Sequence, residues 1–176
     1  GTLVFEPEDF QVDRLDKIRL IPGVIPAMLR LQEAGFSLVM VTNQDGLGTD
    51  SFPQEDFELT QNFILELLES QGIRFAEIFV CPHLPEDACA CRKPLPGLLG
   101  DYLQRVYSDR QASFVAGDRQ TDLDFANNIG VAGYRIDPDN PRAWPNLVRE
   151  LLDAPRRAPV VRETRETRLR VSVDLD

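Results

Sequence analysis

Short apolar runs alternate along the chain with longer amphipathic stretches of helical length. The apolar runs are rich in β-branched and aromatic residues, and they predict buried strands at Ser37–Thr42, Glu77–Cys81, Ser113–Ala116 and Ala132–Ile136. An alternation of strands with helices is typical of a parallel sheet that has helices on its faces. The pattern therefore predicts an α/β domain.

The amphipathic stretches are bounded by glycine and proline, the residues that most often end helices. They predict helices at Val24–Ala34, Gln54–Ser70, Gly97–Val106, Asp122–Asn128 and Ala143–Leu152. Ligands of open parallel sheets bind beyond the carboxyl ends of the strands, where the loops converge. Because polar clusters follow three of the predicted strands, we expect the functional site at that edge of the sheet.

The chain changes character after the last predicted helix. Prolines stand at positions 155 and 159, and the residues that follow alternate between charged and apolar side chains. Polar, proline-containing stretches are typical of linkers between domains. We therefore expect one domain over residues 1–155, followed by a linker and the start of another domain over residues 156–176.

The composition is that of an acidic globular protein. The 176 residues include 29 Asp and Glu against 19 Lys and Arg, which gives a formal net charge of −10. This charge repels nucleic acid and anionic membranes. The sequence also lacks the roughly 18 consecutive apolar residues of a membrane span and the pattern of a signal peptide. We expect a cytoplasmic protein whose partner is a small molecule, not nucleic acid or a membrane.

All three cysteines and the only histidine lie within eleven residues, in the order Cys81, His83, Cys89 and Cys91. Random placement would put them in one such window with a probability below about one in a thousand. Buried small side chains or a disulfide would not require this clustering. Three thiolates and one imidazole form a complete tetrahedral set for Zn²⁺ that leaves no position for water. We predict a structural zinc loop, with a spacing unlike that of a DNA-reading finger.

A second group of polar residues follows the predicted strands in order. Thr42 and Asn43 end the first strand, and Lys93 follows the zinc loop. Asp118 and Asp122 stand four residues apart at the start of a helix. Each has an ordinary alternative explanation as a turn residue, a solvated lysine or a helix cap. Their succession at converging strand ends nevertheless indicates a phosphate site.

In this order the residues resemble the haloacid-dehalogenase-like (HAD-like) phosphatases, which have Ser/Thr at a strand end, then Lys, then Gly-Asp-x-x-x-Asp. The closest resemblance is to the histidinol-phosphate phosphatases, through FQVDR (10–14), TNQDGLGT (42–49), the zinc loop joined to Arg-Lys-Pro, and GDRQTD (117–122). It covers residues 1 to about 155 and implies a Rossmann-like parallel sheet. The tail, with RETRET at 162–167, resembles the start of imidazoleglycerol-phosphate dehydratase, which follows the phosphatase directly in bifunctional enzymes.

The resemblance implies Mg²⁺-dependent hydrolysis of L-histidinol phosphate, a small phosphomonoester, through an aspartyl-phosphate. Asp118 would bind Mg²⁺, and Asp122 would orient Lys93 or a metal-bound water. Thr42 and the backbone around Asn43 would donate hydrogen bonds to the phosphoryl oxygens, while Lys93 would compensate negative charge.

The resemblance also suggests which residues contact the rest of the substrate. These are Glu6, Gln44, Asp45, Arg92 and Arg119. The two acids would accept the cationic groups of histidinol. A homo-oligomer could form through the dehydratase part of a bifunctional protein.

The chain departs from these phosphatases at its first residue. Their first strand ends in Asp-x-Asp-Gly-Thr, whose aspartates are the nucleophile and the general acid and base, whereas this chain starts at Gly1-Thr2. We therefore expect both aspartates, and a central strand of the sheet, ahead of residue 1. We expect no phosphatase activity from these 176 residues alone.

Two other functions fit parts of the pattern. A heptose-bisphosphate phosphatase has a similar zinc loop and fold, but the Gln-Asp-Gly-Leu-Gly loop and the dehydratase-like tail favour histidinol phosphate. A non-catalytic, zinc-stabilised binding module would explain the missing aspartates. It would not explain why Thr42, Lys93 and Asp118 are present together.

Overall fold

Two pairs of parallel strands form the centre of the domain in the computed structural model, which describes residues 1–105, 109–153, 156–163 and 168–175. β1 (Leu38–Asn43) pairs with β2 (Phe75–Cys81), and β3 (Phe114–Gly117) pairs with β4 (Ala132–Arg135). The four predicted strands and the α/β class are confirmed, and the strand ends shift by at most two residues. Within the described residues β1 and β3 each pair with one strand only, so the single sheet expected from the sequence is divided in two.

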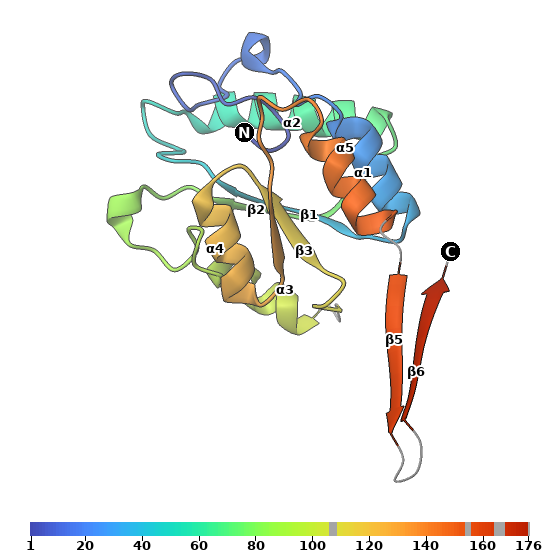
Figure 1. Cartoon of the computed structure of the whole chain (residues 1–176). Coiled ribbons are helices and arrows are strands. Elements are labelled where there is room, and N and C mark those ends of the chain that lie inside the picture. Colours follow the sequence, from blue (N-terminus) through green and yellow to red (C-terminus); the bar gives the residue numbers. More distant parts are fainter. Residues whose placement is uncertain (106–108, 154–155, 164–167, 176) are drawn as a thin grey trace.

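Helices cover these strands (Figure 1). They are α1 (Val24–Glu33), α2 (Gln54–Ser70), α3 (Gly100–Arg105), α4 (Gln120–Ile129) and α5 (Ala143–Leu152). The bounds of α2 and α5 are those predicted. The stretch predicted as one helix from residue 97 starts with a 3-10 turn and continues as α3, and its last predicted residue, Val106, lies outside the described residues.

Helix α4 begins two residues earlier than predicted, because a side chain within its first turn caps it. The Asp122 carboxylate accepts a hydrogen bond from the backbone N–H of Arg119 at 3.0 Å. This bond satisfies one of the amide groups that have no partner inside a helix. The helix ends at Gly130, whose left-handed backbone (φ 74°) suits glycine.

The main core lies where α1 and α5 pack side by side (Figure 1). It contains Ile21, Val24, Ala27, Met28, Leu31, Ile64, Leu68, Ile73, Ile136, Trp144, Leu147 and Val148. The Trp144 indole also donates a hydrogen bond to the carbonyl oxygen of Thr2 at 3.0 Å. The start of the chain is therefore held against α5.

Residues 6–18 form a loop, called here the N-terminal loop, that is closed by backbone pairing at its base. Phe5 N–H donates to Arg19 O at 2.8 Å, and Ile21 N–H donates to Leu3 O at 2.9 Å. The buried Thr60 hydroxyl of α2 donates to Val12 O at 2.7 Å. The loop is thus fixed both at its base and along its length.

The tail forms an antiparallel hairpin of β5 (Arg156–Glu163) and β6 (Arg168–Leu175), which stands apart from the domain in Figure 1. We predicted a linker and the start of a further domain here without assigning strands, although alternation of charged and apolar residues is a strand pattern. Part of the dehydratase-like motif, at 164–167, lies outside the described residues, as does the expected boundary at 155. No helix in the described ranges is long and apolar enough to span a membrane.

Candidate active site and metal centre

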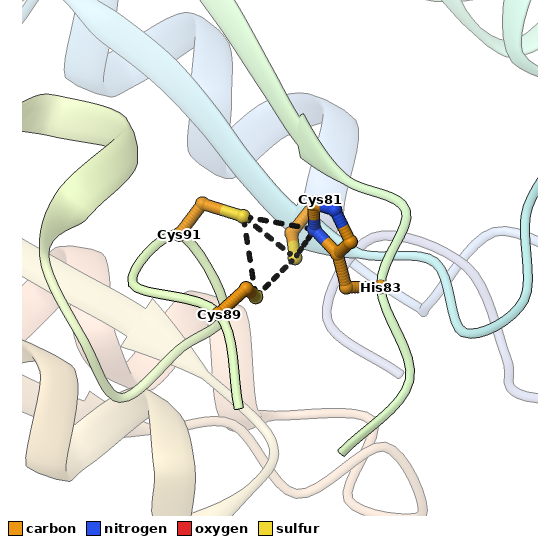
Figure 2. Close-up of side chains that lie close together, drawn as sticks. All are labelled: Cys81, His83, Cys89 and Cys91. Carbon is orange, nitrogen blue, oxygen red and sulfur yellow. Dashed lines mark hydrogen bonds between the residues drawn. The ribbon is translucent and has the colours of Figure 1, made fainter. Parts of the chain in front are cut away.

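The predicted zinc ligands come together after β2 (Figure 2). Cys81 is the last residue of β2 and is fully buried, and His83 follows two residues later. A 3-10 turn and Ala88, in a left-handed conformation (φ 46°), reverse the chain. This reversal brings Cys89 and Cys91 back to the strand end.

The four donor atoms lie at, or slightly closer than, the spacing of a tetrahedral zinc site; His83 Nδ1 and the Cys89 sulfur lie 3.1 and 3.3 Å from the Cys91 sulfur. The Cys81 sulfur lies 3.7 Å from the Cys89 sulfur, 3.2 Å from the Cys91 sulfur and 3.6 Å from His83 Nδ1. Ligands at zinc–sulfur and zinc–nitrogen bond lengths would lie about 3.5–3.8 Å apart around a tetrahedral ion. All three cysteines are free thiols, and the four donor atoms lie within 4.8 Å of one another. The geometry therefore fits a divalent cation.

The three thiols of this cluster change one another's acidity. Burial raises the pKa of Cys89, but hydrogen bonds from the Cys91 side chain, the Arg92 amide and Cys81 bring it down to about 7. Burial, with the neighbouring sulfurs, raises the pKa of Cys91 to about 12. Packed thiolates repel one another, and a bound cation removes that repulsion because it binds the deprotonated forms.

Arg92 connects the zinc loop to the loop after β1. Its guanidinium makes a two-pronged contact with the Asp45 carboxylate, in which Nη2 lies 3.0 Å from Oδ2, and it also donates to His83 O at 3.1 Å. Paired bonds of this kind fix orientation as well as distance. Both residues were predicted to contact substrate, and the structure pairs them with each other.

Lys93 lies partly buried beside the end of β1. Its backbone N–H donates to Asn43 Oδ1 at 3.0 Å, and Asn43 Nδ2 donates to the Lys93 carbonyl at 3.2 Å. The ammonium donates to Val41 O at 2.8 Å and to Asp122 Oδ1 at 2.6 Å. The side chains of Lys93 and Asp122 are only 15% and 6% exposed, so this ion pair is screened little by water.

Asp122 packs directly against the end of β3. A Cβ atom on Gly117 would lie 2.2 Å from the Asp122 Cβ atom, which is closer than real Cβ contacts come. Glycine at this position therefore lets α4 approach the strand closely enough for Asp122 to reach Lys93. The sequence places Gly117 in the motif GDRQTD, but this steric role depends on a contact that only the structure shows.

Asp118 follows β3 and faces the start of the chain. The Thr2 hydroxyl donates to Asp118 Oδ1 at 2.7 Å, and the amino group of Gly1 lies 3.5 Å from the same oxygen. The Thr2 hydrogen bond fixes the orientation of the Asp118 carboxylate. Oδ2 accepts no hydrogen bond from the described residues. A free oxygen on an ionised carboxylate is the kind of ligand that Mg²⁺ prefers.

The remaining predicted contacts lie around this cluster. Arg119 forms an ion pair with Glu6 of the N-terminal loop. Gln44 donates to the Thr42 hydroxyl at 2.9 Å, and its backbone N–H donates to Cys81 O at 2.8 Å. Thr2 was not among the predicted site residues, although its place at the end of the Asp-x-Asp-Gly-Thr motif was a signal.

The comparisons with known proteins agree with this geometry. Residues 90–137 match the family described as HAD-hydrolase-like. The chain is 53% identical over its whole length to the histidine biosynthesis bifunctional protein HisB of Legionella pneumophila (strain Lens) and covers 49% of that protein. It is 46% identical over 179 aligned positions to HisB of Xanthomonas oryzae pv. oryzae (strain PXO99A), of which it covers 48%. The chain therefore spans about half the length of the curated relatives it matches.

Two solved structures resemble the domain. One is D,D-heptose 1,7-bisphosphate phosphatase from B. bronchiseptica, complexed with magnesium and phosphate, at 33% identity and a TM-score of 0.69; the match covers 77% of this chain and 75% of that chain. The other is a HAD-like protein from Mesorhizobium loti at 24% identity and a TM-score of 0.73, covering 86% of this chain and 81% of that chain. The second likeness concerns the fold alone.

The close approach at Gly117 gives a stability prediction. We expect Gly117→Ala to lower the free energy of unfolding by about 1–3 kcal/mol, because the added methyl group overlaps the Asp122 side chain and forces a shift. Gly100→Ala is the matched control. Nothing lies within 4 Å of a Cβ at that position, so it should be neutral or slightly stabilising. Urea denaturation measures both, and equal stability of the two variants would contradict the prediction.

Proposed function

Because the chain belongs to the HAD-like phosphatases, we propose that it is the histidinol-phosphate phosphatase part of a bifunctional histidine-biosynthesis protein. The reaction would convert L-histidinol phosphate to L-histidinol and phosphate. The observation that carries this proposal is the 53% identity to HisB over the whole chain. A dehydratase activity elsewhere in the same protein, and a homo-oligomer formed through that part, belong to the same proposal.

Heptose bisphosphate is the second candidate substrate. It is favoured by the 33% identity and the TM-score of 0.69 to D,D-heptose 1,7-bisphosphate phosphatase. Identity to the HisB proteins is higher and extends over the whole chain, whereas the match to the heptose phosphatase covers 77% of it. We therefore rank histidinol phosphate first.

We propose that Mg²⁺ binds at Asp118, whose carboxylate follows β3 at the strand end and whose Oδ2 accepts no hydrogen bond from the described residues. When bound, the ion would neutralise charge on the phosphoryl oxygens during in-line transfer. Thr2 would hold the Asp118 carboxylate in one orientation through its 2.7 Å hydrogen bond. This leaves Oδ2 directed to the metal.

Lys93 would add the positive charge of a side chain to that of the metal ion at the phosphate site. Its ammonium is already held by Val41 O and Asp122. The side chain would therefore not have to reorient when the phosphoryl group binds. Asp122 is thus a positioning residue for Lys93. Thr42 and the amides near Asn43 would donate to the phosphoryl oxygens from the end of β1.

We propose that Zn²⁺ fills the site formed by Cys81, His83, Cys89 and Cys91, and that it is structural because all four positions are taken by protein atoms. The metal would fix the loop that precedes Lys93. It would therefore act on the phosphate site through the backbone, without touching substrate.

The zinc proposal predicts about one equivalent of zinc in protein purified without chelators, measured by metal analysis. We expect Cys89→Ala combined with Cys91→Ala to lose this zinc and to lower the melting temperature. Glu86→Ala, an exposed position in the same loop, should keep the metal. Unchanged zinc content in the double variant would refute the assignment.

The substrate proposal predicts that the protein expressed from its whole natural reading frame hydrolyses histidinol phosphate in the presence of Mg²⁺. We expect its kcat/KM for histidinol phosphate to exceed that for D,D-heptose 1,7-bisphosphate by at least about tenfold, since this ratio measures differential binding of the two transition states. Phosphate release with both substrates measures it. A higher kcat/KM for the heptose would overturn the assignment.

A further inference from the structure

Phe10 stands out because it combines exposure with a strained backbone. Its side chain is 70% exposed, the highest value among the exposed large apolar residues of the described chain. Its φ angle is +62°, in the left-handed region that glycine adopts freely and that bulky residues avoid. Strained residues that the fold maintains occur most often at functional sites.

The ring contacts the side chain of the residue that follows the predicted metal ligand. The guanidinium carbon of Arg119 lies over the Phe10 ring, 6.0 Å from its centroid, within the range of a cation–π contact. Arg119 directly follows Asp118 in the chain, and its guanidinium also pairs with Glu6. The Phe10 ring therefore contacts the side chain of the residue directly after Asp118.

Phe10 is exposed although the N-terminal loop around it is well fixed by hydrogen bonds and ion pairs. The Lys17 ammonium lies 2.5 Å from the Asp9 carboxylate and 2.6 Å from that of Asp13, and it donates to Gln11 O at 3.2 Å. Phe10 N–H itself donates to Pro7 O at 2.9 Å, which forms a turn. The backbone on both sides of Phe10 is thus fixed in the conformation that holds the ring out.

We propose that Phe10 is a specificity-determining residue whose open ring face stacks on the planar ring of the substrate. This inference rests on the proposed function, because the imidazole of histidinol phosphate is that ring. Aromatic groups stack in offset or edge-to-face arrangements, and a phenyl face also attracts a cationic ring. A heptose has no planar face, so the same contact favours histidinol phosphate over the sugar phosphate.

The test compares two substrates that differ only by the imidazolylmethyl group. O-phosphoethanolamine keeps the phosphate and the neighbouring amine of histidinol phosphate but has no imidazole. In the full-length protein, Phe10→Gly should lower kcat/KM for histidinol phosphate by about tenfold, mainly by raising KM. The kcat/KM for O-phosphoethanolamine should stay within about twofold of the wild-type value. Phe10→Tyr should retain most of the activity, because it keeps an aromatic face.

Two controls separate this effect from damage to the fold. Phe10→Gly suits a φ of +62° better than phenylalanine does, so its melting temperature should not fall. Leu15→Ala removes another exposed apolar side chain of the same loop, 44% exposed, and should change neither substrate's kcat/KM.

The outcomes distinguish this proposal from the proposed function. If the wild-type protein hydrolyses histidinol phosphate and Phe10→Gly lowers kcat/KM equally for both substrates, or for neither, the stacking role is refuted and the function stands. If the wild-type protein prefers the heptose bisphosphate, the proposed function fails and the stacking proposal fails with it.

Discussion

The buried ion pair between Lys93 and Asp122 is the interaction on which the rest of the site depends. It joins the loop after β2 to the start of α4, and the Lys93 ammonium also reaches the carbonyl of Val41 in β1. Removing one partner of a buried pair leaves an uncompensated charge, at a cost of about 3–5 kcal/mol. The three strand ends that carry the phosphate-site residues are therefore held in one arrangement by a single side chain.

The zinc loop and the glycine at position 117 support that pair from opposite sides. The loop sets the backbone immediately before Lys93, and Arg92 ties it to Asp45 in the loop after β1. Gly117 lets Asp122 pack against β3. A shift in either support would move one charge away from the other, so the proposed phosphate site depends on both.

The sequence predicted the parts of this protein that local patterns determine. Strands and helices appear within a few residues of their expected positions, because each buries an apolar run between glycine or proline boundaries. The cluster of three cysteines and one histidine could be found because all four stand within eleven residues. The bond between Thr2 and Asp118 joins residues 116 positions apart, and no local pattern encodes such a contact. The tail hairpin was missed although its alternation was visible.

The pairing of charges also changes how substrate recognition should be understood. The sequence suggested Glu6 and Asp45 as acceptors for a cationic substrate, but in the structure Arg119 and Arg92 already pair with them. A paired carboxylate attracts a further cation less strongly than a free one, because its charge is largely compensated. These acids instead orient the two arginines, and Arg119 in turn lies over Phe10. Recognition beyond the phosphate would then depend more on shape and aromatic contact than on net charge.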